Sequence, residues 1–263
     1  MALIAVTSAN GSPGVTTSAL GLALNWPRPV VLVDVDPTGA SAVPAGYLRG
    51  GELPTSKTVV DLAISLRQGT LVEDLPRLVF TLPDTQVQML AGPLNHHQAQ
   101  ALDPLWEPLA AALKALERNG QDVIVDIGRL GLQGSAYKLL AAADLALLTT
   151  RSNLPALVGA SSWASALRAT FEQAGARSSL ALLLVGENRP YGAGEAAKAL
   201  ELPVIASLAW DPDAAAVYSE GAKPQRKFAA AALNKSLRAA VQAIQATLAS
   251  SRAELSLATD RSQ

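Results

Sequence analysis

One stretch near the start of the chain decides the fold: TSANGSPGVTTSALGLALN, which runs from Thr7 to Asn25. It follows a short apolar run, contains Gly11 and Gly14, and passes through a Thr-Thr pair into a helical pattern. Glycines let backbone N–H groups wrap an oxyanion, and the following helix adds its positive N-terminal end. The stretch therefore predicts a phosphate-binding loop, although Val15 stands where such a loop keeps a lysine.

Short apolar runs recur along the whole chain, and helical patterns alternate with them. The runs are apolar on both faces, which is typical of parallel strands covered by helices on each side. They predict one doubly wound α/β domain over residues 1–250, with a mostly parallel sheet of about seven or eight strands flanked by helices. Residues 251–263 are expected to form a flexible tail. The runs span residues 3–9, 29–36, 87–93, 122–128, 144–150, 179–187 and 203–210.

Three other segments give specific expectations. Gly39 to Pro54 is rich in Gly, Pro and Ser and predicts a long loop, of a kind that is more often functional or mobile than idle. A helix is expected around Gln98 to Glu117, with a kink or a later start at Pro108. The last helix is expected to begin near Arg226 and to pack an apolar stripe on the sheet.

The composition excludes several classes of protein. The 263 residues are 49% apolar, carry a net charge of −1 and include no cysteine, so thiolate metal sites and disulfide frameworks are ruled out. The only histidines, His96 and His97, are adjacent, whereas a helical metal pair needs i, i+4 spacing. The chain lacks a signal-peptide pattern and an unbroken apolar run of about 18 residues. We therefore expect a cytoplasmic protein without a transmembrane segment or a membrane-targeting helix.

Carboxylates stand at the ends of two predicted strands, where parallel sheets bind their ligands. Asp34 and Asp36 end the run PVVLVDVD, and two positions apart in an extended chain they point to the same side. Asp126 ends the apolar part of DVIVDIG. In a phosphate loop a Ser or Thr hydroxyl holds magnesium. We predict Thr16, Asp34 and Asp126 as metal ligands, and Asp36 and Asp126 as the catalytic carboxylates.

Five segments together resemble the MinD/ParA family of deviant P-loop ATPases. The family loop G-K-G-G-x-G-K-T-T corresponds to ANGSPGVTT at residues 9–17, and the family's D-x-D-P-x-G corresponds to DVDPTG. The strand that ends in Asp appears as VIVDIG, the A-D-x-x-x-x-x-T-T strand as ADLALLTT, and the late P-V-x-x-x-x-P-x-D segment as PVIASLAWDPD. The resemblance covers residues 1 to about 245. More narrowly, the segments SPGVTT, WPRPVVLVDVDP and LAWDPDAAAVYSEG resemble MinD-like proteins of actinobacteria.

The resemblance implies ATP or ADP with Mg²⁺ as the cofactor. It places the phosphates on the loop and the adenine near the late segment. Asn188 is interpreted as an adenine partner, the alternative being an asparagine that caps its own loop. The residues expected to bind the cofactor are Gly11, Ser12, Gly14, Val15, Thr16, Thr17, Arg129, Asn188 and Asp211.

The departures from the family pattern concern charge. Asn10 replaces the signature lysine that reaches the partner subunit's nucleotide in the ATP-bound dimer, and Val15 replaces the lysine on the β- and γ-phosphates. Ser12 replaces a glycine, and Pro13 removes one backbone N–H from the loop. Because phosphoryl transfer depends on positioning and charge neutralisation, hydrolysis is expected to fall by orders of magnitude while weaker binding survives.

Other cations are candidates for the missing charge. Arg129 follows Asp126, and Arg151 follows the LLTT strand; each is alternatively a solvated or ion-paired arginine. A separate group of cations near the last helix is a candidate for non-specific DNA contact, which we do not favour because such a density is ordinary for a surface helix. This group comprises Lys223, Arg226, Lys227, Lys235 and Arg238.

Three functional hypotheses follow. The first is a cytoplasmic positioning or scaffolding protein with a degenerate nucleotide site, which acts through protein partners and in which a homodimer is one alternative. The second is a slow ATPase for DNA or plasmid partition, or for placing a division site or secretion apparatus, with a substitute arginine. The third is a nucleotide-free interaction module in which the Thr-Thr loop only caps a helix.

Overall fold

The apolar runs form one eight-stranded sheet in the computed structural model, which describes residues 2–39, 41–50, 56–116, 120–176 and 179–260. The strand order is β3-β4-β2-β5-β1-β6-β7-β8, and every pair is parallel except β3 with β4. The predicted fold class is therefore confirmed. The strands are β1 (Leu3–Ser8), β2 (Val30–Asp34), β3 (Phe80–Thr81), β4 (Gln88–Leu90), β5 (Asp122–Arg129), β6 (Leu145–Arg151), β7 (Leu180–Val185) and β8 (Val204–Leu208).

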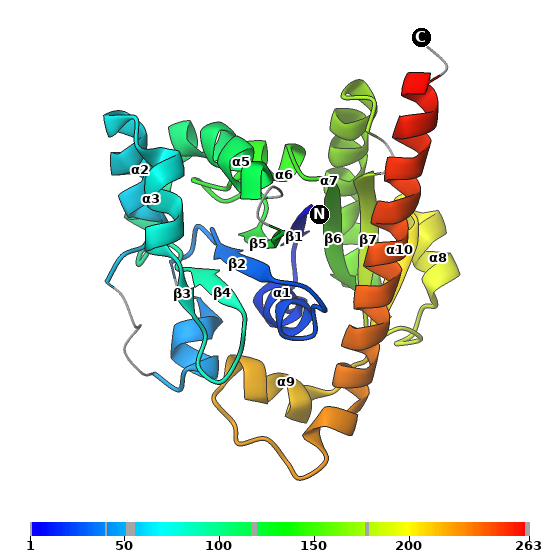
Figure 1. The fold of residues 1–263 in the computed structure, drawn as a ribbon. Coiled ribbons are helices and arrows are strands. Elements are labelled where there is room, and N and C mark those ends of the chain that lie inside the picture. Colours follow the sequence, from blue (N-terminus) through cyan, green and yellow to red (C-terminus); the bar gives the residue numbers. More distant parts are fainter. Residues whose placement is uncertain (1, 40, 51–55, 117–119, 177–178, 261–263) are drawn as a thin grey trace.

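Helices cover both faces of the sheet, which explains why the strands are apolar on both sides. In β1, Leu3 and Ala5 belong to one buried layer, and Ile4 and Val6 belong to the other. The first layer packs against α2 (Val59–Gln68), α3 (Leu71–Leu78), α5 (Trp106–Ala115), α6 (Tyr137–Ala141), α7 (Leu154–Gln173) and α8 (Ala193–Leu200). The second packs against α1 (Val15–Leu24), α9 (Pro212–Ser219) and α10 (Ala232–Asp260), and Figure 1 shows α5 and α6 opposite α1 and α9.

Several predicted segments differ in detail. The helix expected around Gln98 to Glu117 is divided into α4 (His96–Gln100), a 3-10 turn (Asp103–Leu105) and α5. The loop expected from Gly39 to Pro54 contains a π-helical turn, η1 (Val43–Tyr47), while residues 51–55 lie outside the described residues. This turn packs closely on α9, because a Cβ on Gly46 would lie 2.1 Å from the Ser219 carbonyl oxygen.

The last helix begins at Ala232 instead of near Arg226. A 3-10 turn (Phe228–Ala230) precedes it, and the Asn234 side chain donates a hydrogen bond of 2.7 Å to the Phe228 carbonyl. At its other end α10 runs to Asp260, into the segment that the sequence predicts to be a tail. Within the described part of the chain, no helix has both the length and the apolarity that a membrane span requires.

Candidate nucleotide site

The loop between β1 and α1 keeps the backbone shape of a phosphate-binding loop. Gly11, Ser12 and Gly14 have φ values of 70°, 43° and 93°, all in the left-handed region. Such a backbone turns successive N–H groups to one side, which creates an anion-binding concavity. Gly14 is the N-cap of α1, and no described side chain caps the first N–H groups of this helix. These donors therefore remain available to an anion.

The two positions that lost a lysine are built into the packing. Val15 is only 8% exposed and belongs to the apolar layer under α1 and α10. The Asn10 amide donates a hydrogen bond of 3.3 Å to the Pro155 carbonyl at the start of α7. A Cβ on Gly159, one turn further along α7, would lie 1.8 Å from Asn10 Nδ2. Asn10 is thus held by a helix of its own chain.

Three predicted carboxylates meet at the carboxyl ends of β2 and β5. Asp34 and Asp126 are partners in the parallel register, and both are buried. Asp34 Oδ1 accepts a hydrogen bond from the Asp36 backbone at 3.0 Å, and Asp126 Oδ1 accepts one from Gly128 at 2.9 Å. Asp36 lies against Gly128, since a Cβ there would be 2.4 Å from Asp36 Cγ. The sequence prediction that these groups share one site is consistent with this geometry.

The electrostatics of the two buried carboxylates would favour the binding of a cation between or beside them. Asp34 Oδ2 and Asp126 Oδ2 are buried and accept no hydrogen bond from any described residue. Burial, partly offset by the Ser41 hydroxyl, raises the pKa of Asp34 to about 6. Burial and the nearby charge of Asp34 raise the pKa of Asp126 well above its usual range, against the opposing effect of the Thr16 hydroxyl. A divalent cation would restore the ionised form of both groups.

The donor set fits hydrated Mg²⁺ better than a metal held by the protein alone. Among the described residues, no three His, Cys, Asp or Glu side chains are placed to hold a metal ion together. Mg²⁺ in phosphate loops usually keeps several waters and takes few protein ligands besides phosphate oxygens. The Thr16 hydroxyl, which faces Asp126, and the two unpartnered carboxylate oxygens are suitable for this kind of binding.

A cavity of about 240 Å³ lies beside the loop, between it and α9. Ser12, Gly14 and Thr17 form one side of this loop cavity, and Trp210 forms another. Arg151, the last residue of β6, joins the two sides. Its Nη2 donates a hydrogen bond of 3.1 Å to the Ser12 carbonyl, and its Cζ lies 4.8 Å from the centroid of the Trp210 ring.

The other predicted ligands are distributed unevenly. Asp211 lines the cavity, but its oxygens accept the backbone N–H groups of Ala214 at 3.2 Å and Leu233 at 3.4 Å, so it caps α9 and joins it to α10. Asn188 is exposed beyond β7 with a φ of 62° and is not among the residues that line the loop cavity. Arg129 is exposed at the end of β5. Its role as a phosphate contact stays a prediction.

Trp210 is the site residue that sequence reasoning missed. It stands inside LAWDPD, directly before Asp211, so its proximity to the late segment was readable from the sequence. Its contact with Arg151 was not readable, because β6 and the residue after β8 are separated by β7 in the sheet.

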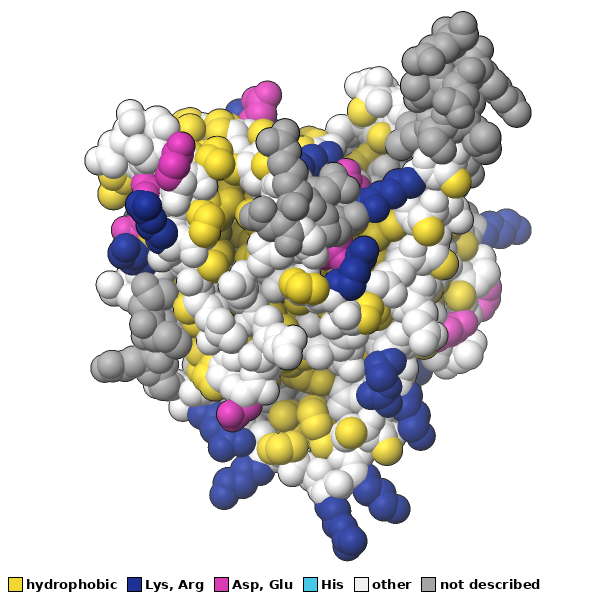
Figure 2. Space-filling model, viewed as in Figure 1, with side chains coloured by type: hydrophobic (Ala, Val, Ile, Leu, Met, Phe, Trp, Pro, Cys, Tyr) yellow, Lys and Arg dark blue, Asp and Glu magenta, His cyan; other side chains and the backbone are white. Residues whose placement is uncertain are grey.

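The cations proposed for DNA gather at one end of the molecule. Lys223, Arg226 and Lys227 lie between α9 and α10, and Lys235 and Arg238 lie in the first turns of α10. Figure 2 shows Lys and Arg side chains around this lower end of the molecule. Arg238 Nη2 also donates to the Ala229 carbonyl at 2.9 Å, so this group already has a structural contact.

A mostly parallel sheet with a glycine loop after β1 and carboxylates after β2 and within β5 defines the fold of the P-loop nucleoside triphosphatases. More narrowly, the chain has the fold of the MinD and ParA ATPases. No known protein-family profile and no curated protein sequence matches it. The likeness therefore comes from solved structures, and the three described next are 13 to 19% identical to this chain.

Three solved structures illustrate the likeness. The septum site-determining protein MinD with Mg-ADP from Pyrococcus horikoshii is 19% identical, covers 92% of this chain and 95% of its own, and has a TM-score of 0.67. A ParA family ATPase from Chlorobium tepidum is 18% identical over 92% and 97%, with a TM-score of 0.70. MinD in the MinC:MinD cell division complex of Aquifex aeolicus is 13% identical over 94% and 96%, with a TM-score of 0.69.

Proposed function

We propose that this chain is a cytoplasmic MinD/ParA-like positioning or scaffolding protein that binds ATP or ADP with Mg²⁺ weakly and hydrolyses ATP slowly or not at all. One observation carries the proposal. The uncapped N-terminus of α1 and the bare oxygens of Asp34 and Asp126 still suit a magnesium-bound phosphate, whereas Val15 and Asn10 are closed by packing. The loop therefore keeps its means of binding and lacks its two lysines.

Each part of the site has a distinct role in this proposal. The loop N–H groups and the N-terminus of α1 hold phosphate oxygens, and the Thr16 hydroxyl holds the metal with Asp34 and Asp126 behind it. Mg²⁺ supplies charge neutralisation when bound. Asp36 is half-buried at the edge of the site, where it would orient a water. Without the two lysines the barrier to hydrolysis rises by several kcal/mol.

Partner binding is the expected output of such a site. The MinC:MinD structure joins a protein of this fold to a protein partner. A chain that has lost its catalytic cations but kept its nucleotide loop is suited to hold a partner instead of cycling rapidly. We therefore propose protein partners, with a homodimer as one form of assembly.

Nucleotide titration tests the proposal directly. We expect calorimetry to detect Mg-ADP binding with a Kd of roughly 0.1–1 mM, because the backbone donors remain and the cations do not. Gly14→Asp should abolish it, since it adds a negative charge and a strained φ to the loop. Gly69→Asp is the matched control: Gly69 has a φ of 76° and open space around it, but it ends α2 outside the loop cavity.

Two outcomes would contradict the proposal. If neither wild type nor Gly14→Asp shows binding heat at Mg-ADP concentrations several times the expected Kd, the nucleotide-free interaction module is favoured. Rapid phosphate release from ATP, suppressed by Gly14→Asp and unchanged in Gly69→Asp, would show a working ATPase and remove the degenerate site.

The basic group between α9 and α10 favours one second candidate, a slow ATPase that acts in DNA partition. Non-specific DNA binding by these cations would weaken steeply as salt rises, because phosphate contacts release counterions. A gel shift of random duplex DNA at 50 and 200 mM salt tests it. A shift that is absent even at low salt removes this candidate.

A further inference from the structure

The loop cavity contains a cation that the loop itself does not supply. Arg151 enters from the end of β6, and its guanidinium reaches the Ser12 carbonyl. No described carboxylate forms an ion pair with it. A guanidinium offers five N–H donors, and the buried Nε of Arg151 has no hydrogen-bond partner among the described residues. Two carboxylates line the same cavity, Asp211 and Glu220. Asp211 accepts two backbone N–H groups and Glu220 is exposed, and neither forms an ion pair with Arg151.

Trp210 supplies a flat apolar surface next to this cation. Its side chain is 40% exposed, whereas Trp26 and Trp106 are buried. Leaving a large aromatic group in solvent forgoes burial that would stabilise the fold, so its position needs a reason. One side of its ring receives the Arg151 guanidinium, which is a favourable cation–π arrangement. Trp210 also lines the loop cavity.

We propose that Arg151 and Trp210 are the recognition pair of this site, and that its ligand is a nucleoside di- or triphosphate. Arg151 supplies the phosphates with the positive charge that Val15 does not, and Trp210 stacks on the base. The inference rests on the proposed function, since it assigns residues to the same nucleotide site. It also selects Arg151 over Arg129, because the Arg151 side chain contacts the loop at Ser12, whereas Arg129 is exposed at the end of β5.

A purely structural reading is that Arg151 only holds Ser12 in its left-handed conformation. The two readings differ in ligand preference. A phosphate contact should matter for ADP and not for adenosine, whereas a loop staple should affect both ligands and the unfolding free energy alike. Arg151→Lys separates them further: it keeps the charge but loses the planar fork that reaches Ser12 and covers the Trp210 ring.

The experiment measures Mg-ADP and adenosine binding to the full chain by calorimetry, together with urea unfolding of each variant. We expect Arg151→Ala and Arg151→Gln to weaken ADP binding about tenfold and adenosine binding less than about twofold, since one charge-assisted contact is lost. Arg151→Lys should fall between these and wild type. Trp210→Ala should weaken both ligands by similar factors, and Trp210→Phe should weaken neither by more than about threefold.

Arg67→Ala is the matched control and should bind ADP as wild type does, because Arg67 is exposed in the last turn of α2 and does not line the loop cavity. The inference is overturned if Arg151→Ala and Arg151→Gln bind ADP within about twofold of wild type, or if Arg129→Ala carries the loss instead. It is also overturned if ADP and adenosine weaken together with a drop in stability. If wild type binds no Mg-ADP, the proposed function itself is overturned. This result differs from one in which wild type binds Mg-ADP and the Arg151 substitutions leave its affinity unchanged. The Gln variant keeps a donor and an uncharged stem, so a folding failure of Arg151→Ala still leaves a measurement.

Discussion

Two aspartates on the same strand, Asp122 and Asp126, are buried in opposite ways. Asp122 Oδ1 accepts the Ala2 backbone N–H at 2.7 Å, and its Oδ2 accepts both the Trp26 indole and the Arg28 guanidinium at 2.7 Å. Asp126 accepts one backbone N–H from Gly128, and its other oxygen is bare among the described residues. Both oxygens of Asp122 accept hydrogen bonds, whereas Asp126 Oδ2 accepts none from the described residues.

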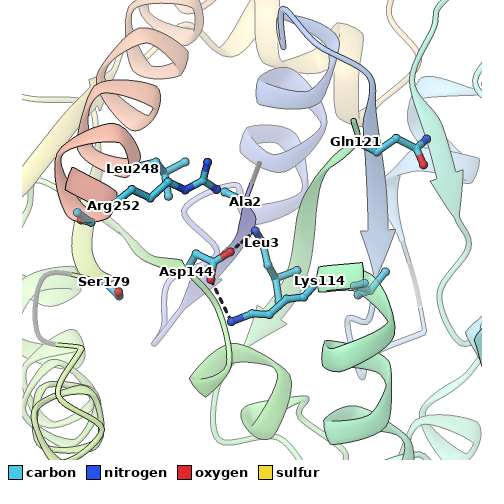
Figure 3. Close-up of a pocket in the computed structure, with 10 residues that line it drawn as sticks. Ala2, Leu3, Lys114, Gln121, Asp144, Ser179, Leu248 and Arg252 are labelled. Carbon is cyan, nitrogen blue, oxygen red and sulfur yellow. Dashed lines mark hydrogen bonds and ion pairs between the residues drawn. The ribbon is translucent and has the colours of Figure 1, made fainter. Parts of the chain in front are cut away.

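The two ends of the sheet differ in the same way. At the amino ends of the strands, Asp144 accepts the Leu3 backbone N–H at 2.8 Å and pairs with Lys114 at 3.0 Å, as Figure 3 shows in a cavity there of about 260 Å³. At the carboxyl ends, Asp34 and Asp126 keep bare oxygens. Because both ends use the same residue type, burial alone does not identify a functional carboxylate. Unsatisfied burial at the carboxyl ends of parallel strands is the observation from which we predict a binding site.

The largest expected effect comes from removing a hydrogen-bonded carboxylate at the amino ends of the strands. Asp122→Asn should lower the free energy of unfolding by about 3 to 5 kcal/mol at pH 7, because it removes the charge that pairs with Arg28 and turns an amide NH2 toward one of two buried donors, the Ala2 N–H or the Trp26 indole, which then has no acceptor. Urea unfolding measures it. The matched variant, Asp126→Asn, should be neutral or stabilising, since no cation among the described residues pairs with this carboxylate and its Oδ2 accepts no hydrogen bond from them. Equal losses in both variants would mean that the two ends do not differ.

The next effect concerns pH at the unsatisfied end. The pKa of Asp34 is raised from 3.8 to about 6, so its contribution favours folding below about pH 4 and is lost as pH rises through 6. Asp34→Asn removes this loss while its side-chain oxygen can still accept the Asp36 N–H. We expect the variant to exceed wild type by about 3 kcal/mol at pH 7 and by much less at pH 4, from two pKa units of linkage.

Urea unfolding of both proteins at pH 4 and pH 7 measures this difference without nucleotide. A gap that stays constant between the two pH values would mean that Asp34 titrates normally. Asp61→Asn is a suitable control, because Asp61 is a capping-box carboxylate whose oxygen accepts the Thr58 N–H at 2.8 Å. It should not be stabilised at pH 7.

Much of this contrast could be predicted from the sequence, and the reasons are physical. Apolar runs on both faces require helices on both sides, so the sheet follows from patterns such as LIAV and VIVD. Asp34, Asp36 and Asp126 follow too, since parallel strands end at one edge. By contrast, β3 has two residues and no period to detect, and the turn at Val43–Tyr47 depends on its packing against α9.

The contacts of the site required three dimensions. Arg129 and Arg151 are both strand-end arginines in the sequence, and only folding brings Arg151 to Ser12 and Trp210. Asp211 reads as a ligand in a family motif, yet its oxygens accept backbone N–H groups from two helices. Asn10 reads as a missing charge, and its packing on α7 is invisible in the sequence because the two segments are far apart along the chain.

The smallest expected effect concerns Asn10, at the carboxyl ends of the strands. Unlike Asp34 and Asp126 there, its side chain has a hydrogen-bond partner, the Pro155 carbonyl in α7. Gly159→Ala in α7 should stabilise the helix by about 1 kcal/mol through propensity, but the new Cβ would lie 1.8 Å from Asn10 Nδ2. We expect the gain to appear in an Asn10→Ala background and to be cancelled or reversed in wild type. Urea unfolding of the four proteins gives a coupling energy of about 1 kcal/mol or more. Additive effects would mean that Asn10 is not held by α7. Its side chain would then be available to contact a partner subunit.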